Sequence, residues 1–309
     1  MTTPRPPSLN LVLSILVLTL AGCTCRLVAA DTVVLKNSTT EIHVSIPTGK
    51  MMFFGIPDGP NLFWTPQPAS SVASDASPAM PLIGTTGGSR MYPAQQALWH
   101  FIWGEEWSGR KFETLRWHLI TQTEHSILLQ SEPCQELSLI LRREFIIPTA
   151  TPSRVADTAG PTATVIDTAA RTAPNPFPVQ LWTVTQIPWP RRLVMTTNGK
   201  PYVIIGNRRY YRPTSIQTRS NFIELDLPNI LTGLKIGTPG DRLEATFGSG
   251  ILLKQGRYNP EACYPDGASV ECYIDKEFVE LETFSESLHL KPGETLSFTT
   301  TWRFSPSRN

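Results

Sequence analysis

The chain has 309 residues, including 28 Pro and 20 Gly, and only 17% of them are charged. Because Pro breaks helices and here exceeds its usual share of roughly 5%, the composition argues against helical bundles and favours strands joined by many turns. The 27 basic and 26 acidic residues leave no charge surplus for binding nucleic acid, and the 40% hydrophobic content excludes a chain that is disordered throughout.

The first predicted element is a secretory signal peptide over residues 1–22. Arg5 precedes an apolar run, Leu11–Leu20, that is too short for a bilayer span of about 20 residues. The run leads into Leu20-Ala21-Gly22-Cys23, which resembles the lipobox of bacterial lipoproteins. In that family the cysteine thiol is acylated before the signal is cleaved, so the resemblance implies lipidation at Cys23. The alternative is a cleaved signal followed by an incidental cysteine.

A lipid at Cys23 would anchor the protein to a membrane through a short tether, residues 23–30. Two or three acyl chains are enough for stable anchoring. Thr24 stands where an inner-membrane retention signal would have Asp. We therefore expect a lipoprotein of the bacterial cell envelope, held in the outer membrane and facing the periplasm.

From Asp31 onward, short runs of apolar and β-branched residues alternate with clusters of Gly, Pro, Asn and Asp, a pattern typical of strands. Residues 95–101 fit a helical turn, and no stretch shows sustained helical periodicity. We expect one all-β domain over residues 31–306, with the architecture of a large antiparallel sandwich. The expected strands cover residues 32–35, 41–46, 111–120, 125–130, 137–147, 162–166, 179–187, 202–205, 222–225, 242–247, 251–254, 270–274, 278–284 and 295–303.

Five cysteines fit an exported chain. Cys263 and Cys272 flank the turn sequence Tyr264-Pro265-Asp266-Gly267, so a local disulfide is one interpretation. The other is two free thiols that pack as small apolar side chains, with Cys134 a buried free thiol. The sequence has neither a metal-binding spacing such as CxxC nor a phosphate-binding Gly-rich loop, so we expect no metal and no cofactor.

The C-terminal part of the chain resembles the galactose mutarotases (aldose 1-epimerases). The matching segments are Phe278–Thr283, Leu290–Thr295 and Thr299–Phe304. In that family a Leu-Glu-Thr segment carries the catalytic glutamate, and a Lys-Pro-Gly-Glu turn leads into the last strand. The resemblance implies a supersandwich of the galactose mutarotase-like type, with Glu282 as the base.

Two further segments resemble the same superfamily. Pro178–Gln186 is similar to the central strand that brings a catalytic histidine into the mutarotase cleft, and Gln186 or a neighbour stands in the region of that histidine. Gly87–Gln95 is similar to uncharacterised, mostly lipoprotein, bacterial members. The paired histidines of the family are not found here, so the resemblance implies a sugar-binding cleft with weak or no catalysis.

The alternation of apolar residues predicts which side chains meet on the last hairpin. Pairing the two apolar faces of residues 270–284 places Tyr273 opposite Glu280 and Glu271 opposite Glu282. Carboxylates that face each other about 5 Å apart repel, and the pKa of one of them rises. A packed sheet keeps such a pair only with a cation, a shared proton or a ligand, so these residues are the candidate site. The alternative is a solvated outer face that binds nothing.

Aromatic and polar residues elsewhere fit a carbohydrate cleft, because indole rings stack on sugar rings while carboxylates accept hydroxyl hydrogens. His100 is the candidate general acid that would act with Glu282. The alternative for each tryptophan is a core position. Besides the three glutamates, the candidate ligand-binding residues are Arg90, Trp103, Trp182, Gln186 and Tyr273, within a wider set of Trp99, Phe101, Trp107 and Trp189.

The sequence leaves three functions open. The first is a lipid-anchored envelope protein that binds a mono- or oligosaccharide in a mutarotase-like cleft, with weak or no catalysis. The second is an active aldose 1-epimerase that uses Glu282 as base and His100 or Glu271 as acid. The third is an envelope scaffold with a vestigial cleft, which predicts a cleft closed by side chains and buried tryptophans.

Overall fold

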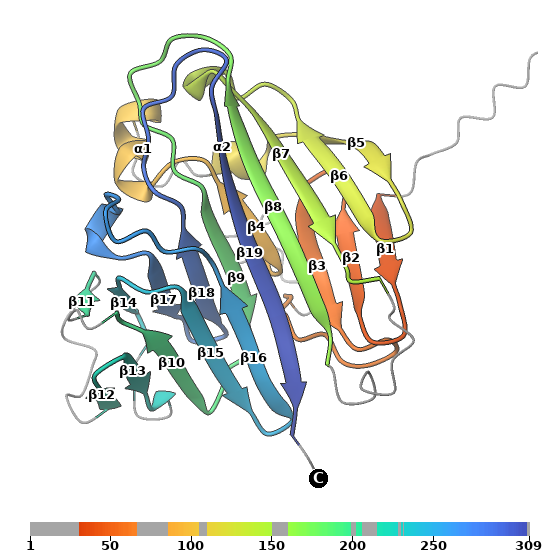
Figure 1. Cartoon of the computed structure of the whole chain (residues 1–309), viewed down its shortest axis with the longest axis vertical. Coiled ribbons are helices and arrows are strands. Elements are labelled where there is room, and N and C mark those ends of the chain that lie inside the picture. Colours follow the sequence, from red (N-terminus) through yellow and green to blue (C-terminus); the bar gives the residue numbers. More distant parts are fainter. Residues whose placement is uncertain are drawn as a thin grey trace, which may run out of the picture. The chain divides into compact units, whose positions relative to one another are not determined.

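The structure is a computed structural model that describes residues 31–66, 86–104, 110–149, 160–198, 202–205, 215–227, 230 and 232–307. These residues form two antiparallel sheets with only short helices, so the predicted all-β class is confirmed (Figure 1). The predicted signal peptide (1–22) and tether (23–30), with the lipidation at Cys23, lie outside the described residues. Among those described, no helix is long and apolar enough to cross a membrane.

Two large sheets account for the strands in the part of the chain that the structure describes. The nine-stranded sheet has the order β1 (Thr32–Lys36), β2 (Glu41–Ser45), β3 (Lys50–Gly55), β4 (Ser89–Tyr92), β9 (Trp182–Ile187), β18 (Val279–Phe284), β17 (Val270–Ile274), β14 (Leu234–Thr238) and β11 (Val203–Ile204). The ten-stranded sheet has the order β12 (Ile216–Thr218), β13 (Phe222–Leu225), β10 (Arg192–Thr196), β15 (Arg242–Phe247), β16 (Gly250–Gln255), β19 (Thr295–Pro306), β8 (Thr162–Arg171), β7 (Leu139–Ile146), β6 (Ser126–Ser131) and β5 (Trp117–Gln122).

The helical segments are short and lie in the connections. They are α1 (Gln96–Trp103), α2 (Arg110–Glu113) and the 3-10 turns η1 (Gln135–Leu137) and η6 (Pro265–Gly267). The helical turn expected over 95–101 is α1, whereas the strand expected over 111–120 is wrong in its first half. A helical turn, α2, stands there in place of the strand. Phe112 of this turn is buried against the rings of Trp99 and Trp103 of α1.

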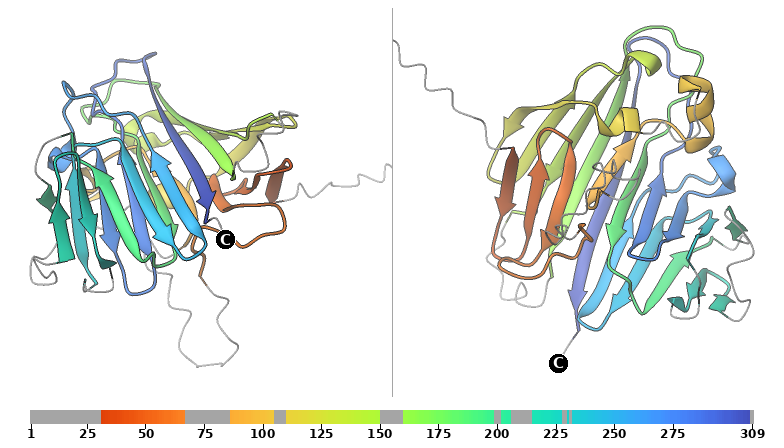
Figure 2. Two further views of the ribbon diagram at one scale, coloured as in Figure 1. Left: turned by 60° about the horizontal axis from the view of Figure 1, so that its bottom comes forward. Right: turned by 180° about the vertical axis from the view of Figure 1, so that it is seen from behind.

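The two sheets pack face to face, and the hydrophobic core lies between them (Figure 2). Trp302 of β19 is completely buried in this layer, and its indole N–H lies 3.3 Å from the Thr185 hydroxyl of β9. Lys254 of β16 is buried too, and its ammonium group donates to the main-chain oxygens of Thr183 (2.9 Å) and Leu281 (2.8 Å). Lys254 therefore ties the ten-stranded sheet to β9 and β18, the central strands of the other sheet.

The disulfide predicted between Cys263 and Cys272 is not formed, since both thiols are free. Cys272 lies with Val270 and Ile274 on the inner face of β17 and is completely buried. Cys263 lies in the loop before η6 and is exposed. The parity of the strand therefore places one thiol in the core while the other faces solvent. Cys134 is a buried free thiol, as the alternative interpretation expects.

Candidate functional site

The register predicted for the last hairpin is confirmed. β17 and β18 pair so that Glu271 lies opposite Glu282 and Tyr273 lies opposite Glu280. All four side chains project from the outer face of the nine-stranded sheet, the face turned away from the other sheet, because their neighbours in each strand fill the core. The two facing glutamates are almost completely buried, at 1% and 0% exposure, so their charges need a partner within the protein or a ligand.

Lys235 of β14 supplies that partner, and the sequence interpretation missed it. Its ammonium group lies 3.0 Å from Oε2 of Glu271 and 2.9 Å from Oε2 of Glu282, so one cation bridges both carboxyl groups. β14 pairs with β17 on the side away from β18, which brings Lys235 onto the same outer face. Of its three N–H donors, two are used by the glutamates and one is left for another acceptor.

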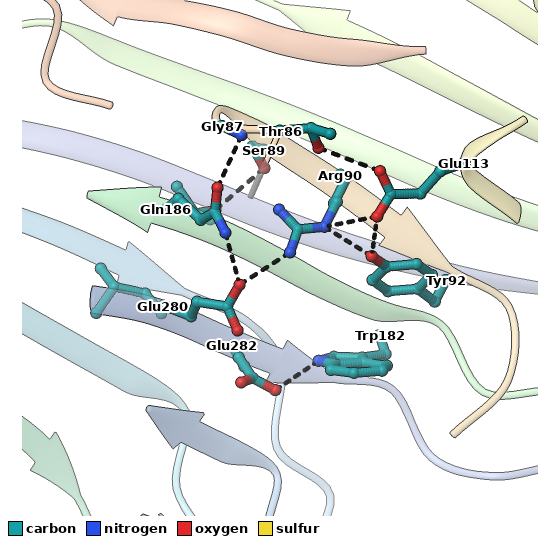
Figure 3. A network of polar contacts seen from close by, with 12 residues as sticks. Thr86, Gly87, Ser89, Arg90, Tyr92, Glu113, Trp182, Gln186, Glu280 and Glu282 are labelled. Carbon is teal, nitrogen blue, oxygen red and sulfur yellow. Dashed lines mark hydrogen bonds and ion pairs between the residues drawn. The ribbon is translucent and has the colours of Figure 1, made fainter. Parts of the chain in front are cut away.

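Trp182 of β9 closes the other side of this cluster. Its indole N–H donates to Oε2 of Glu282 at 2.7 Å, and the ammonium group of Lys235 lies 4.9 Å from the centre of a Trp182 ring. The ring of Phe284 stacks on Trp182 with centroids 5.7 Å apart and an interplanar angle of 11°. The indole therefore combines an apolar surface with a hydrogen bond that holds its orientation (Figure 3).

The electrostatics of the bridge leave one carboxyl group protonated near neutral pH. Burial raises the pKa of Glu271, Lys235 lowers it, and the negative charge of Glu282 raises it again, with a net result of about 8. Burial alone would lower the pKa of Lys235, but the two glutamates outweigh it and the net shift is upward. Lys235 therefore stays charged, while Glu271 can present an O–H donor.

Arg90 of β4 organises a second polar cluster on the same face. Its guanidinium donates to Glu280 at 2.8 Å and to the hydroxyl of Tyr92 at 2.8 Å. The side-chain amide of Gln186 also donates to Glu280, at 2.9 Å, and its oxygen accepts the main-chain N–H of Gly87 at 2.8 Å (Figure 3). These groups satisfy one another, so the second cluster fixes β4, β9 and β18 side by side.

Glu113 of α2 extends this second cluster. Its carboxylate accepts hydrogen bonds from Tyr92 (2.6 Å), Lys50 (2.6 Å) and the hydroxyl of Thr86 (3.1 Å). Burial raises the pKa of Glu113, but the charges of Lys50 and Arg90 outweigh it, so the net shift is downward and the group stays ionised. The second cluster thus joins α2 to the sheet through charged hydrogen bonds.

A pocket of about 520 Å³ opens beside the Lys235 bridge, a size within the range of roughly 300–1,000 Å³ that accommodates small-molecule ligands. Its floor comes from the sheet and its walls from α1, η6 and the segment after β11. The lining residues are Trp182, Lys235, Glu271 and Phe284 on the floor, Gln95, Gln96, Ala97, His100 and Phe101 on the α1 side, and Ile205, Pro265 and Asp266 on the opposite side.

Only part of the predicted site lines this pocket. Trp182, Glu271 and His100 line it, and Glu282 lies just beneath, bonded to two of the lining residues. The pocket walls do not include Arg90, Gln186, Glu280 or Tyr273, although all four share the outer face of the sheet. Arg90, Gln186 and Glu280 belong to the second cluster instead.

Trp103 is placed elsewhere, against Phe112 and beside a separate cavity of about 220 Å³ that Cys134 also lines. Trp99 is a core residue, only 2% exposed, as the alternative for each tryptophan expects. Trp107 lies outside the described residues. Among the predicted tryptophans that the structure describes, Trp182 therefore is the one that lines the pocket and has a polar partner there.

The chemistry available at Glu282 is limited by its partners. In the described part of the chain its carboxylate receives hydrogen bonds from Trp182 and Lys235, and no histidine lies within hydrogen-bonding distance of it. Oε1 of Glu282 is buried and makes no hydrogen bond to any described residue. His100 is exposed on α1 and has no carboxylate partner in the same part of the chain.

Metal binding finds no support in the geometry. No group of three or more His, Cys, Asp or Glu side chains among the residues that the structure describes is arranged to hold a metal ion. The charge of the carboxylates is offset by Lys235 instead. The pocket thus offers donors, acceptors and aromatic faces to an organic ligand with hydroxyl groups.

Comparisons with solved structures identify the fold. A galactose mutarotase related enzyme from Lactobacillus acidophilus superposes with a TM-score of 0.55 and 8% identity, over 88% of this chain and 97% of that chain. A galactose mutarotase-like protein from Lactobacillus casei gives 0.53 and 7%, over 88% and 99%. The Slr1438 protein from Synechocystis gives 0.55 and 11%, over 89% and 96%.

The likeness lies in the fold and not in the sequence. No family model matches the sequence, and a comparison with curated protein sequences gives no match. The solved structures nevertheless cover nearly the whole of the described domain. The chain therefore has the galactose mutarotase-like sandwich fold that its C-terminal segments predict.

Proposed function

We propose that the protein is a lipid-anchored carbohydrate-binding protein of the bacterial cell envelope, with weak or no catalysis. The observation that carries the binding function is the pocket in which the Trp182 and Phe284 rings lie beside Lys235 and Glu271. The aromatic faces suit the C–H side of a sugar ring, while the spare donor of Lys235 and the protonated carboxyl of Glu271 suit its hydroxyl groups. The mutarotase-like fold supports the same ligand class.

An aldose 1-epimerase is the second candidate, and one observation favours it. Oε1 of Glu282 is buried without a hydrogen-bond partner among the described residues, close to a Glu271 that can donate a proton. A base must reach the anomeric hydroxyl, however, and Glu282 is completely buried with its other oxygen bonded to Trp182 and Lys235. The geometry therefore favours binding over turnover.

The open pocket also argues against a scaffold whose cleft is closed by side chains.

Replacing Trp182 tests the binding function. We expect Trp182→Leu to weaken sugar binding at least tenfold, about 1.4 kcal/mol, because it removes the stacking face and the hydrogen bond to Glu282. The control is Trp189→Leu, since Trp189 is a partly buried tryptophan that packs against the core but does not line the pocket. Binding is measured by a glycan-array screen followed by calorimetry with the sugars that bind, and far-UV circular dichroism checks folding. Equal affinities of the wild type and the folded Trp182→Leu variant would show that the sugar does not bind in this pocket.

The same samples separate binding from turnover. Polarimetry on freshly dissolved α-anomers should show no acceleration of mutarotation by the wild type, since Glu282 is not accessible as a base. An acceleration that Glu282→Gln abolishes would favour the epimerase.

The lipid anchor is tested at Cys23. We expect cells to incorporate labelled palmitate into the wild-type chain and not into Cys23→Ser, because acylation needs the thiol. Envelope fractionation of the same cells should then release the variant from the membrane fraction. Labelling of both chains, or of neither, would contradict the lipoprotein assignment.

A further inference from the structure

The most exposed large apolar side chain among the described residues lies at the mouth of the pocket. Phe101 of α1 is 71% exposed, against 52% for Ile120, the next in that set. Most of its ring therefore contacts water, although burial of a phenylalanine stabilises a protein substantially. A single exposed apolar residue is ordinary on a surface, but this one lines a pocket whose floor is already aromatic.

The packing of α1 against the sheet sets the position of Phe101. The neighbouring Trp99 is only 2% exposed and packs against Tyr92 and Trp182, with centroids 5.3 Å and 5.8 Å away. Gly104 ends α1 in the left-handed conformation, at φ 77°, and its N–H donates to the main-chain oxygen of His100 at 2.6 Å. Because the buried side of α1 packs against Trp182 on the pocket floor, its exposed side presents Phe101 at the rim.

Polar side chains that make no hydrogen bond to any described residue flank this ring. Gln95, Gln96 and His100 line the α1 side of the pocket and Asp266 lines the other side, and none of these side chains makes a hydrogen bond to the rest of the described chain. Asp266 also has a positive φ of 57°, a conformation that is uncommon for residues other than glycine. The upper part of the pocket therefore offers donors and acceptors that the fold itself does not use.

We propose that the pocket binds an oligosaccharide, with one sugar on the Trp182–Phe284 floor and the next sugar against Phe101 at the rim. This inference rests on the proposed carbohydrate-binding function and specifies its ligand. The floor presents Lys235 and Glu271 to the first sugar, and the rim presents Asp266 and the glutamine amides to the hydroxyl groups of the second. A monosaccharide would leave the rim groups solvated, whereas a disaccharide uses both aromatic surfaces.

The experiment compares single and paired sugars on the same protein. The probes are the methyl glycosides of glucose, galactose, mannose and N-acetylglucosamine, and the disaccharides that each of these sugars forms with itself. The full chain in detergent is titrated by calorimetry as the wild type, as Phe101→Ala and as Ile120→Ala. Ile120 is a matched control because it is also an exposed apolar residue but does not line the pocket.

For the sugar that binds, we expect the disaccharide to bind the wild type about tenfold more tightly than the methyl glycoside. Phe101→Ala should remove that gain, so that the two probes bind this variant with affinities within twofold of each other, while Ile120→Ala should keep the tenfold gain. Equal binding of both probes to the wild type, or a gain that survives in Phe101→Ala, would overturn the inference and leave the binding function standing. Failure of both probes to bind would overturn the binding function and this inference together.

Analytical ultracentrifugation of the same samples tests whether Phe101 instead forms a contact between two copies of the chain. The wild type and Phe101→Ala should sediment identically. Self-association of the wild type that Phe101→Ala abolishes would assign the ring to a contact between copies of the chain and overturn the oligosaccharide inference.

Discussion

Replacing Lys235 by Met should lower the free energy of unfolding by about 3–5 kcal/mol, the cost of leaving a buried charge without its partner. Lys235 lies 2.9 Å from Glu282 and 3.0 Å from Glu271, and both glutamates are shielded from water. Methionine fills a similar volume, so the loss comes from the cation and not from packing. Equilibrium denaturation at pH 7 measures the effect.

Two controls isolate the cation. In a Glu271→Gln/Glu282→Gln background, Lys235→Met should cost much less, because no buried carboxylate then depends on it, and the difference is the coupling energy of the bridge. Lys36→Met is the exposed counterpart, since Lys36 also bridges two carboxylates, at 3.0 Å from Glu41 and 3.1 Å from Asp58. It should have little effect because water screens exposed ion pairs. Equal losses for Lys235→Met in both backgrounds would show that the bridge does not stabilise the fold.

The sequence could predict the last hairpin because its information is local. β17 and β18 are joined by a short turn, and the strict alternation of apolar residues fixes both the inner face and the register. The same alternation places Cys272 on the inner face, so the disulfide with Cys263 could have been rejected from the pattern that predicts the carboxylate pair. The alternation along the strand is therefore a stronger guide to the state of Cys272 than the turn sequence that separates it from Cys263.

The cation that completes the site could not be predicted in the same way. Lys235 lies on β14, a strand that the sequence interpretation did not identify, and its contact with Glu282 spans 47 positions in the chain. Arg90 lies on β4, another unidentified strand, 190 positions from Glu280. Short strands that pair only with distant partners carry little periodicity of their own. The partners of Arg90, a predicted site residue, and the presence of Lys235 in the site therefore appear only when the sheet order is known.

The aromatic residues show a related limit. Trp99 and Phe101 stand two positions apart on one helix, yet the first is in the core and the second is 71% exposed. Residues two apart in a helix point in different directions, so their roles depend on which face meets the sheet. Trp182 likewise belongs to the pocket because β9 turns it outward, next to Phe284 of β18. The residue types indicate a carbohydrate cleft, but the packing of the strands and of α1 determines which rings line it.

Stability of the wild type should fall as pH rises from about 5 to about 8, through the ionisation of Glu271. The pKa of this carboxyl is raised from an ordinary 4.5 to about 8 in the folded protein, by burial and by Glu282, with Lys235 opposing. Between these two values the folded state keeps a proton that the unfolded state has lost. The free energy of unfolding must then decrease with pH, by up to about 1.4 kcal/mol per pH unit, and level off above about pH 8.

Glu271→Gln isolates this effect, because glutamine imitates the protonated carboxyl and does not titrate. We expect the variant to match the wild type near pH 5 and to be the more stable protein at pH 8, as measured by chemical denaturation at several pH values. Glu280, whose pKa is also raised by burial, contributes to both proteins and cancels in the difference. Asp266, Glu282 and Lys235 face Glu271 and are likewise unchanged in the pair. A stability difference that stays constant from pH 5 to pH 8 would mean that Glu271 is ionised throughout, and it would remove Glu271 as a proton donor to a sugar hydroxyl.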